Sequence, residues 1–252
     1  MLLYLPSPIY VVLVEPSGPL NIGSVARLCA NFNVSELRLV APRCQPQDPE
    51  AMKMAMHGSS LLKLSRHYPN LLEAIADCRK ILSSCGRCDH GTIPLQTSEQ
   101  ALSWMLENNS SEPVALVFGR EDRGLTNREL LLSHRVIRLY SSSFYPSLNL
   151  SHAVAIVLHD LARLCGTTSG LECTSLASKN KAIPAAPSQL EACLTDASDL
   201  LLETGFLLRH TAWARMAKVR GLLQRAVVRQ EELALIRGMV RQLRWAIRSR
   251  HS

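Results

Sequence analysis

The stretch that decides the fold is Val114–Thr126, Val-Ala-Leu-Val-Phe-Gly-Arg-Glu-Asp-Arg-Gly-Leu-Thr. Its first five residues are apolar and lead directly into Gly119, a pattern that predicts a buried β-strand ending in a tight loop. The loop holds four charged residues between Gly119 and Gly124. Because glycine loses the most backbone entropy on folding, glycines at both ends of a charged loop indicate more than a surface turn.

Strands and helices alternate on both sides of this stretch. Further strands are predicted at Ile9–Val14, Leu37–Val40, Lys80–Leu82 and Val136–Leu139. Helices are predicted from Asn21, as the N-cap, through Cys29, and over Met52–Met56, Leu71–Cys78, Ala101–Glu107, Leu125–Ser133 and Ser147–Leu164. This alternation predicts an α/β fold with a mostly parallel sheet that is covered by helices on both faces.

The chain changes character after this α/β region. From Gly166 to about Ser188 the composition shifts to Gly, Thr, Ser, Ala and Pro, which is typical of a linker. Apolar residues at three- and four-residue spacing then predict helices over Gln189–Leu202, Ala212–Val228 and Glu231–Arg248. We therefore predict an α/β domain over residues 1–165, a linker over 166–188 and a small basic helical region over 189–252.

Positive charge is concentrated in that last region. The chain has a formal net charge of +7 and a pI near 9.1. From Arg209 onward, eleven Lys and Arg residues stand against only Glu231 and Glu232. A polyanionic partner such as RNA explains this excess, because basic residues near phosphates release condensed counterions. A solvated helix face explains it equally well, so charge alone leaves both interpretations open.

Several other classes of protein are disfavoured. The dinucleotide fingerprint GxGxxG, the phosphate loop GxxxxGK[ST] and the hydrolase elbow GxSxG are all absent. Residues 1–8 have no features of a signal peptide, and no apolar run approaches a bilayer span, so we expect a cytoplasmic protein without a membrane segment.

The eight cysteines are scattered, and without a signal peptide we expect reduced thiols. Cys85 and Cys88 form a CxxC, but no second pair exists at zinc-site spacing. A redox role would also require the motif to open a helix after the first strand, whereas here it follows a later element. We therefore expect no metal and interpret the CxxC as coincidence.

Three segments together carry a resemblance to a known family. They are Asn21–Phe32 (NIGSVARLCANF), Val117–Leu130 (VFGREDRGLTNREL) and Ser147–Leu161 (SLNLSHAVAIVLHDL). In this order and spacing they resemble the three motifs of the TrmH-like branch of the SPOUT superfamily, whose members are RNA 2′-O-methyltransferases. Glu203–His210 (ETGFLLRH) and Glu232–Leu243 (ELALIRGMVRQL) are similar to a helical extension found within this branch.

The resemblance implies a fold, a cofactor and a set of site residues. The expected fold is a SPOUT α/β domain with a C-terminal trefoil knot, S-adenosylmethionine is the expected cofactor, and a homodimer is the expected assembly. The implied catalytic residues are Arg27, Ser147, Glu121 and Asn21. The implied cofactor-binding residues are Ser84, Cys85, Gly86, Gly119, Leu139, Pro146, Ser147, Leu148 and Asn149. Contacts with RNA are expected from Arg87, Arg123, Arg220 and Arg225.

The resemblance also implies a reaction, the methylation of a ribose 2′-hydroxyl in tRNA, at position 32 of the anticodon loop. Two alternatives remain at this level. The target nucleotide could lie elsewhere in tRNA or in rRNA. The chain could also be a non-catalytic RNA-binding protein with the same fold, although the intact glycine and asparagine turns of the three motifs disfavour this interpretation.

Overall fold

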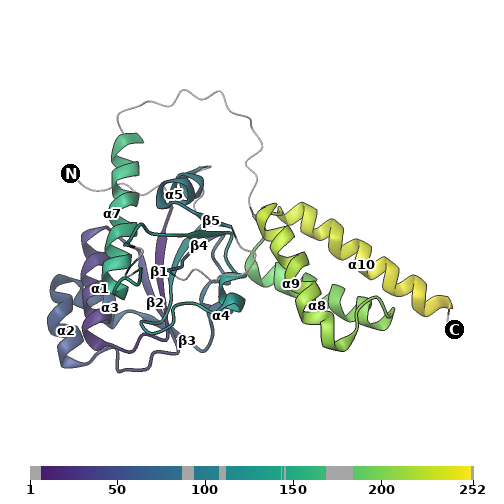
Figure 1. Ribbon diagram of the computed structural model, residues 1–252, viewed down its shortest axis with the longest axis horizontal. Coiled ribbons are helices and arrows are strands. Elements are labelled where there is room, and N and C mark those ends of the chain that lie inside the picture. Colours follow the sequence, from purple (N-terminus) through teal and green to yellow (C-terminus); the bar gives the residue numbers. More distant parts are fainter. Residues whose placement is uncertain are drawn as a thin grey trace. The chain divides into compact units, whose positions relative to one another are not determined.

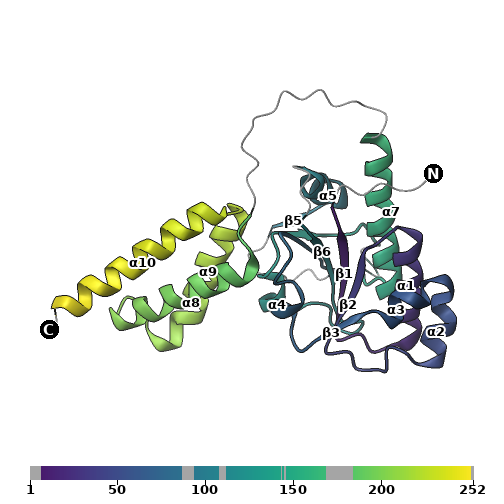
Figure 2. The ribbon, with the colours of Figure 1, turned by 180° about the vertical axis from the view of Figure 1, so that it is seen from behind.

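The computed structural model describes residues 7–86, 94–107, 112–142, 144, 146–168 and 184–250 (Figures 1 and 2). The chain divides into two compact units, Met1–Lys181 and Ala182–Ser252. Most of the predicted linker, residues 169–183, lies outside the described residues.

The first unit is built on a seven-stranded sheet in the order β3-β2-β1-β6-β4-β7-β5. All of its strand pairs are parallel. The strands are β1 (Ile9–Val14), β2 (Glu36–Val40), β3 (Arg66–Tyr68), β4 (Lys80–Ser84), β5 (Leu95–Gln96), β6 (Val114–Phe118) and β7 (Arg135–Ile137). This sheet confirms the predicted α/β fold, while the trefoil knot stays a prediction.

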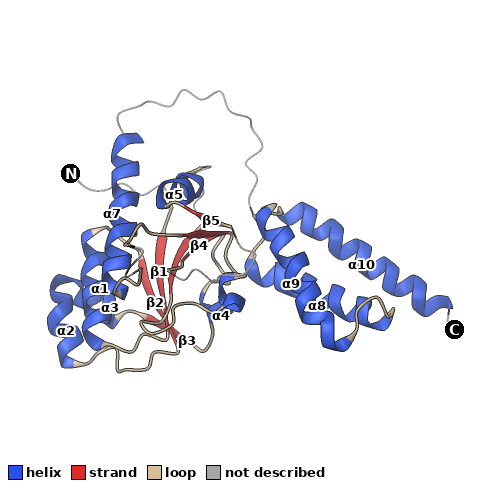
Figure 3. Ribbon diagram, viewed as in Figure 1, coloured by secondary structure: helices blue, strands red, loops and turns tan. Residues whose placement is uncertain are grey.

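Helices cover the two faces of the sheet unequally (Figure 3). One face packs against α1 (Pro19–Asn31), α2 (Pro49–Ala55), α3 (Ser59–Lys63), α5 (Ser98–Leu106) and α7 (Leu150–Thr168). The other face packs against the short helices α4 (Leu71–Ala74) and α6 (Asn127–Leu130). A 3₁₀ turn, η1 (Met56–Gly58), joins α2 to α3.

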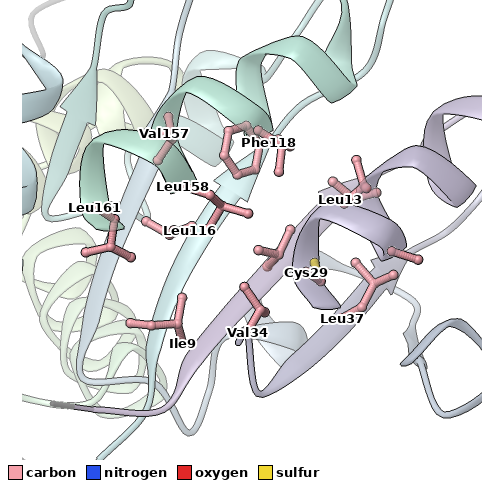
Figure 4. Packing of buried hydrophobic residues seen from close by; sticks show 14 of the residues in the cluster. Ile9, Leu13, Cys29, Val34, Leu37, Leu116, Phe118, Val157, Leu158 and Leu161 are labelled. Atoms are coloured by element: carbon pink, nitrogen blue, oxygen red, sulfur yellow. The ribbon is translucent and has the colours of Figure 1, made fainter. Parts of the chain in front are cut away.

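The strands are apolar on both sides because side chains alternate between two buried faces. In β6, Leu116 and Phe118 point into the larger core, where they pack near α7, whereas Ala115 and Val117 point into the smaller one (Figure 4). A strand that is buried on both faces appears as a continuous apolar run, which is why Val114–Phe118 is so clear in the sequence.

Two glycines allow α1 to pack closely on its neighbours. A Cβ on Gly23 would lie 2.3 Å from the carbonyl oxygen of Ala51 in α2. A Cβ on Gly58 would lie 2.3 Å from the carbonyl oxygen of Ala26 in α1. The glycine early in α1 therefore serves the approach of another backbone segment.

The structure differs from the predicted elements where the sequence signal is short. The helix expected over Leu71–Cys78 is limited to α4, and the helix expected over Leu125–Ser133 is limited to α6. The strands β3 and β5 were not predicted, because two or three residues at a sheet edge carry no periodicity of their own.

The second unit consists of α8 (Pro187–Glu203), α9 (Arg209–Arg225) and α10 (Gln230–Arg250). Its core is small and contains Ala185, Leu190, Cys193, Leu194 and Leu233. Three long helices around so few buried side chains leave most of their surface exposed to solvent. No helix in the described part of the whole chain is long and apolar enough to cross a bilayer.

Candidate active site

A cavity of about 490 Å³ lies where β4, β6 and β7 end. These three strands are neighbours in the sheet, so the loops that follow them converge at its carboxyl edge. The cavity is lined by Ser84, Cys85, Gly86, Phe118, Gly119, Arg120, Glu121, Asp122, Arg123, Gly124, Leu139, Pro146, Ser147, Leu148, Leu150 and Ala153. All the predicted cofactor positions except Asn149 are among them.

Gly119 and Gly124 close the second loop on itself. A Cβ on Gly119 would lie 2.3 Å from the carbonyl carbon of Gly124 and 2.4 Å from the nitrogen of Leu125. Gly124 has a φ of +66°, in the left-handed region that favours glycine. The glycine pair in the sequence therefore marks a tight turn beside the cavity, in which the two ends of the loop touch.

The carboxylate of Glu121 points from this loop to the start of α1. It accepts hydrogen bonds from the backbone nitrogens of Ser17, at 3.1 and 3.2 Å, and of Gly18, at 3.2 Å. The side chain of Asn21 donates a further bond of 3.2 Å. Burial alone would raise the pKa of Glu121, but these hydrogen bonds and one from its own backbone lower it, so the group is held as an anion.

Asn21 and Asn149 extend this network to the third loop. The side-chain amide of Asn149 donates to the side-chain oxygen of Asn21 at 3.0 Å. The side-chain oxygen of Asn149 accepts bonds from the backbone nitrogen and hydroxyl of Ser151, at 2.9 and 2.7 Å. The chain Glu121–Asn21–Asn149 thus joins three loops that are distant in sequence.

These contacts correct two predicted helix starts. Asn21 does not cap α1, which begins at Pro19 with Gly18 as its N-cap and no side-chain cap. Its side chain instead serves the contact with the distant Glu121. The third-motif helix begins at Leu150 and not at Ser147, because Asn149 supplies the acceptor for its first turn and Ser147 remains in the loop that lines the cavity.

Beneath the second loop lies a cluster of charges that sequence reasoning missed. Arg120 is buried, and its guanidinium donates to both carboxylate oxygens of Glu129 at 2.9 Å and to Glu15. Glu15 also accepts from Arg43, through Nε at 2.8 Å and through Nη2. Arg123, which is exposed at the cavity rim, lies 3.7 Å from Glu15. The cluster ties together the ends of β1, β2 and β6.

Two features of the sequence could have pointed to this cluster. Glu15 stands one residue beyond the end of β1 and Arg120 two residues beyond the end of β6, and the parallel register of the two strands places these positions side by side. Thr126 and Glu129 form a capping box, whose S/T-x-x-E pattern is visible in the sequence. The hydrogen bond from Arg120 is the largest of the interactions that lower the pKa of Glu15, to about 2.

Arg27 stands apart from the cavity. It is exposed on α1 and is not among the residues that line the cavity. Arg87, the other arginine expected near the cofactor loops, lies outside the described residues, as does Cys88 of the CxxC. Cys85 is buried and lines the cavity. Among the residues that the structure describes, no cluster of three His, Cys, Asp or Glu side chains could hold a metal ion.

The two arginines of the C-terminal unit from which RNA contacts are expected differ in their surroundings. Arg220 is mostly buried and donates to both carboxylate oxygens of Glu191 in α8, with one bond of 2.7 Å. Arg225, at the end of α9, is exposed. The first therefore holds α9 against α8, whereas the second presents its charge to solvent.

Comparison with known proteins identifies the family of this chain. Residues 8–159 match the model of the SpoU rRNA Methylase family. The chain belongs to this family. It is therefore a methyltransferase of the SPOUT class, and the methyl donor of the family is S-adenosylmethionine.

The similarity extends beyond the family match. The tRNA (cytidine/uridine-2′-O-)-methyltransferase TrmJ of Klebsiella pneumoniae is 32% identical over 235 residues, which cover 92% of this chain and 94% of that protein. The crystal structure of TrmJ from Z. mobilis ZM4 superposes with a TM-score of 0.80 at 28% identity and covers 94% of this chain and 99% of that one. A probable methylase family protein from Haemophilus influenzae gives a TM-score of 0.61 at 26% identity, over 96% and 98% of the two chains.

The residues around the cavity fit S-adenosylmethionine. The volume of about 490 Å³ is within the range of small-molecule sites. Phe118, Leu139 and Leu148 supply apolar surface of the kind that an adenine ring requires, and Asp122 brings a negative charge to the lining. The loops also bring backbone polar groups to the carboxyl edge of the sheet, where ligands of α/β folds bind.

Proposed function

We propose that this chain transfers a methyl group from S-adenosylmethionine to the ribose 2′-hydroxyl of a tRNA nucleotide, at position 32 of the anticodon loop. The named relatives support the substrate, since they are tRNA (cytidine/uridine-2′-O-)-methyltransferases over nearly their full length. The observation that carries the proposal is the cavity at the ends of β4, β6 and β7, where Glu121, Asn21 and Asn149 link the loops after β6 and β7 to the start of α1.

The cofactor would be held by the predicted loops. Ser84, Cys85 and Gly86 would form one side of its site, Gly119 the second, and Leu139 with Pro146, Ser147 and Leu148 the third. When bound, the cofactor supplies a sulfonium methyl that is already activated for transfer. The protein's part is therefore to align the ribose hydroxyl and to help remove its proton.

Arg27 is the proposed residue for the substrate phosphate and the hydroxyl. A guanidinium is a poor base, because its pKa exceeds about 12 in proteins. Arg27 would instead clamp a phosphate and lower the pKa of the ribose hydroxyl through its charge, while Ser147 orients that hydroxyl. Asn21 and Glu121 would act indirectly. Their hydrogen bonds would fix the loop before α1 relative to the second motif.

A homodimer explains why Arg27 lies outside the cavity lining of its own subunit. In the proposed assembly two subunits complete each site, so that Arg27 serves the cavity of its partner. The assembly would act on tRNA in the cytoplasm. Arg87, Arg123 and Arg225 would contact RNA, whereas the same role for Arg220 would require its ion pair with Glu191 to open.

The test is transfer of labelled methyl groups from S-adenosylmethionine to unmodified tRNA, followed by mapping of the product. A 2′-O-methyl nucleotide at position 32 is the expected result. Label at another tRNA position, or in rRNA only, would retain the chemistry and overturn the target. RNA binding without any transfer would establish the non-catalytic alternative.

Arg27→Lys refines the test of mechanism. Lysine keeps the charge but loses the planar, two-pronged donor set of arginine. We expect a loss of kcat of roughly tenfold or more, since misplacing a reacting group by about 1 Å can cost about 10²-fold. Near-normal turnover would show that charge alone is sufficient.

A further inference from the structure

The backbone of Arg27 is contacted by a segment that carries no predicted site residue. The turn η1 (Met56–Gly58) joins α2 to α3, which pack beside α1, the helix that carries Arg27 (Figure 1). A Cβ on Gly58 would lie 2.3 Å from the carbonyl oxygen of Ala26 and 2.8 Å from the backbone nitrogen of Arg27. Gly58 therefore packs directly on the peptide bond that joins Ala26 to Arg27, at a distance that only glycine allows.

The turn that brings Gly58 to this peptide bond has a strained backbone. Met56 has a φ of +49° and a ψ of −120°, a conformation that glycine adopts readily and that other residues avoid. Its side chain is 55% exposed, so burial of that side chain does not explain the strain. Strained residues persist where the surrounding structure enforces them, and they are concentrated at functional sites.

Both flanks of the turn are fixed to the catalytic unit. Ala55 and Leu62 are fully buried in the larger core. The backbone nitrogen of Ser59 also donates to the carbonyl oxygen of Met56. The side chain of Arg27, in contrast, is exposed and has many rotamers. The position of its backbone is therefore what the surrounding fold can fix, and catalysis depends on such alignment.

We propose that η1 is a positioning segment for Arg27. The strained turn at Met56 directs Gly58 against the Ala26–Arg27 peptide, and this contact sets the direction in which the guanidinium reaches the substrate. The inference rests on the role proposed above for Arg27 in methyl transfer. It assigns Met56 and Gly58 a role without contact with the cofactor, since neither is among the residues that line the cavity.

Gly23 offers a matched control on the same helix. A Cβ on Gly23 would lie 2.3 Å from the carbonyl oxygen of Ala51 in α2, so the steric conflict is as severe as at Gly58. The backbone that must move is that of α2, however, and not the Ala26–Arg27 peptide. Gly23→Ala and Gly58→Ala should therefore lower the melting temperature alike, whereas only Gly58→Ala should displace Arg27.

Steady-state methyl transfer to tRNA tests this difference. Gly58→Ala should lower kcat by at least about tenfold, since a displacement of about 1 Å can cost about 10²-fold, and should leave S-adenosylmethionine binding unchanged. Gly23→Ala should lower kcat much less. In an Arg27→Lys background the two glycine variants should have equal effects, because changes that act through one group are not additive. Equal losses of kcat in the parent background, or an undiminished loss in the Arg27→Lys background, would overturn the inference.

Met56→Gly tests the turn without adding an atom to a packed region, so it keeps the inference testable if Gly58→Ala does not fold. Relief of strain offsets the backbone entropy that the new glycine loses on folding, and the turn gains conformational freedom. We expect a melting temperature no lower than that of the parent together with a several-fold lower kcat. A kcat equal to that of the parent would overturn the positioning role.

Alkylation of Arg27→Cys separates a failure of this inference from a failure of the proposed function. It requires no methyl transfer, and peptide mapping distinguishes the new thiol from the native cysteines. Adding Gly58→Ala should change the alkylation rate at position 27, whereas adding Gly23→Ala should not. If the parent transfers no methyl group to RNA, the proposed function is overturned, and the alkylation rates alone decide whether η1 positions residue 27. Rates that are the same in both glycine variants would overturn the inference.

Discussion

The two units of this chain bury arginine to different extents. In the catalytic unit, Arg38 is 1% exposed and donates to Glu36 and Asp77, and Arg120 joins Glu15 to Glu129. In the C-terminal unit most arginines are exposed, and Arg220 with its carboxylate partner is an exception. The net charge of the chain therefore does not tell which arginines are available to an RNA.

The difference follows from the layers that each unit can build. A sheet covered on both faces encloses strand ends, where several loops supply acceptors for one guanidinium. A three-helix unit with a small core has few such places, and its long basic side chains extend into solvent. Buried arginines therefore stabilise loops, whereas exposed arginines are available to a partner.

The largest expected effect comes from Arg120→Ala. Removing this guanidinium leaves Glu15 and Glu129 without their main partner, and breaking such a buried pair costs on the order of 3 kcal/mol of unfolding free energy. Urea denaturation measures it. Arg123→Ala, in the same loop but exposed, should change the unfolding free energy by less than about 0.5 kcal/mol. Equal losses of unfolding free energy in the two variants would contradict the distinction between buried and exposed arginines.

Gly119→Ala should weaken cofactor binding more than it lowers the stability of the fold. The new Cβ would lie 2.3 Å from the backbone of Gly124, so the loop beside the cavity must move. We expect about tenfold or greater weakening of S-adenosylmethionine binding by calorimetry, in keeping with the cost of a displaced binding loop. Gly166→Ala in α7 meets no atom within 4 Å and should leave binding unchanged.

The acid sensitivity of the catalytic unit should depend on Glu15. Its pKa is lowered from 4.5 to about 2, so its ion pairs stabilise the fold fully above pH 4.5 and lose this contribution as pH falls toward 2. The difference in unfolding free energy between the parent and Glu15→Gln, measured between pH 7 and pH 3, should therefore narrow toward the acid end. A constant difference would contradict the assigned pKa.

The smallest effects are expected in the C-terminal unit. Arg225→Gln should weaken tRNA binding by about threefold and reduce the salt slope of log Kd by about one phosphate contact. Arg220→Gln should lower the thermal stability of the unit by a few degrees, with little change in the salt slope. Fluorescence anisotropy over a salt series, with thermal melts of the same samples, separates the two. A smaller salt slope of log Kd for Arg220→Gln would show that Arg220 also contacts RNA.

Much of the site could be predicted because it follows long strands. β1 and β6 have the predicted bounds, since a strand that is buried on both faces must be apolar at every position. The loops after the central strands then had to converge, which is why Gly86, Gly119 and Leu148 line one cavity. Their order along the chain also carried the resemblance to the family.

The parts that the sequence could not predict depend on partners far along the chain. Asn21 has the character of a helix cap, and only the fold brings it to Glu121, 100 residues away, and to Asn149. Arg120 is one of four charges in a loop, and only its contacts with Glu15 after β1 and with Glu129 in α6 make it a buried one. Local propensity is decided within a few residues, whereas these contacts exist only after the chain has folded.

The sequence by itself thus determined the parallel α/β architecture, the family and the three loops of the site, because apolar periodicity and glycine positions are local properties. The tertiary structure decided which charges are buried, how the loops are linked, and which segment packs on the backbone of Arg27. Those properties depend on which residues meet in space, and no local pattern encodes that.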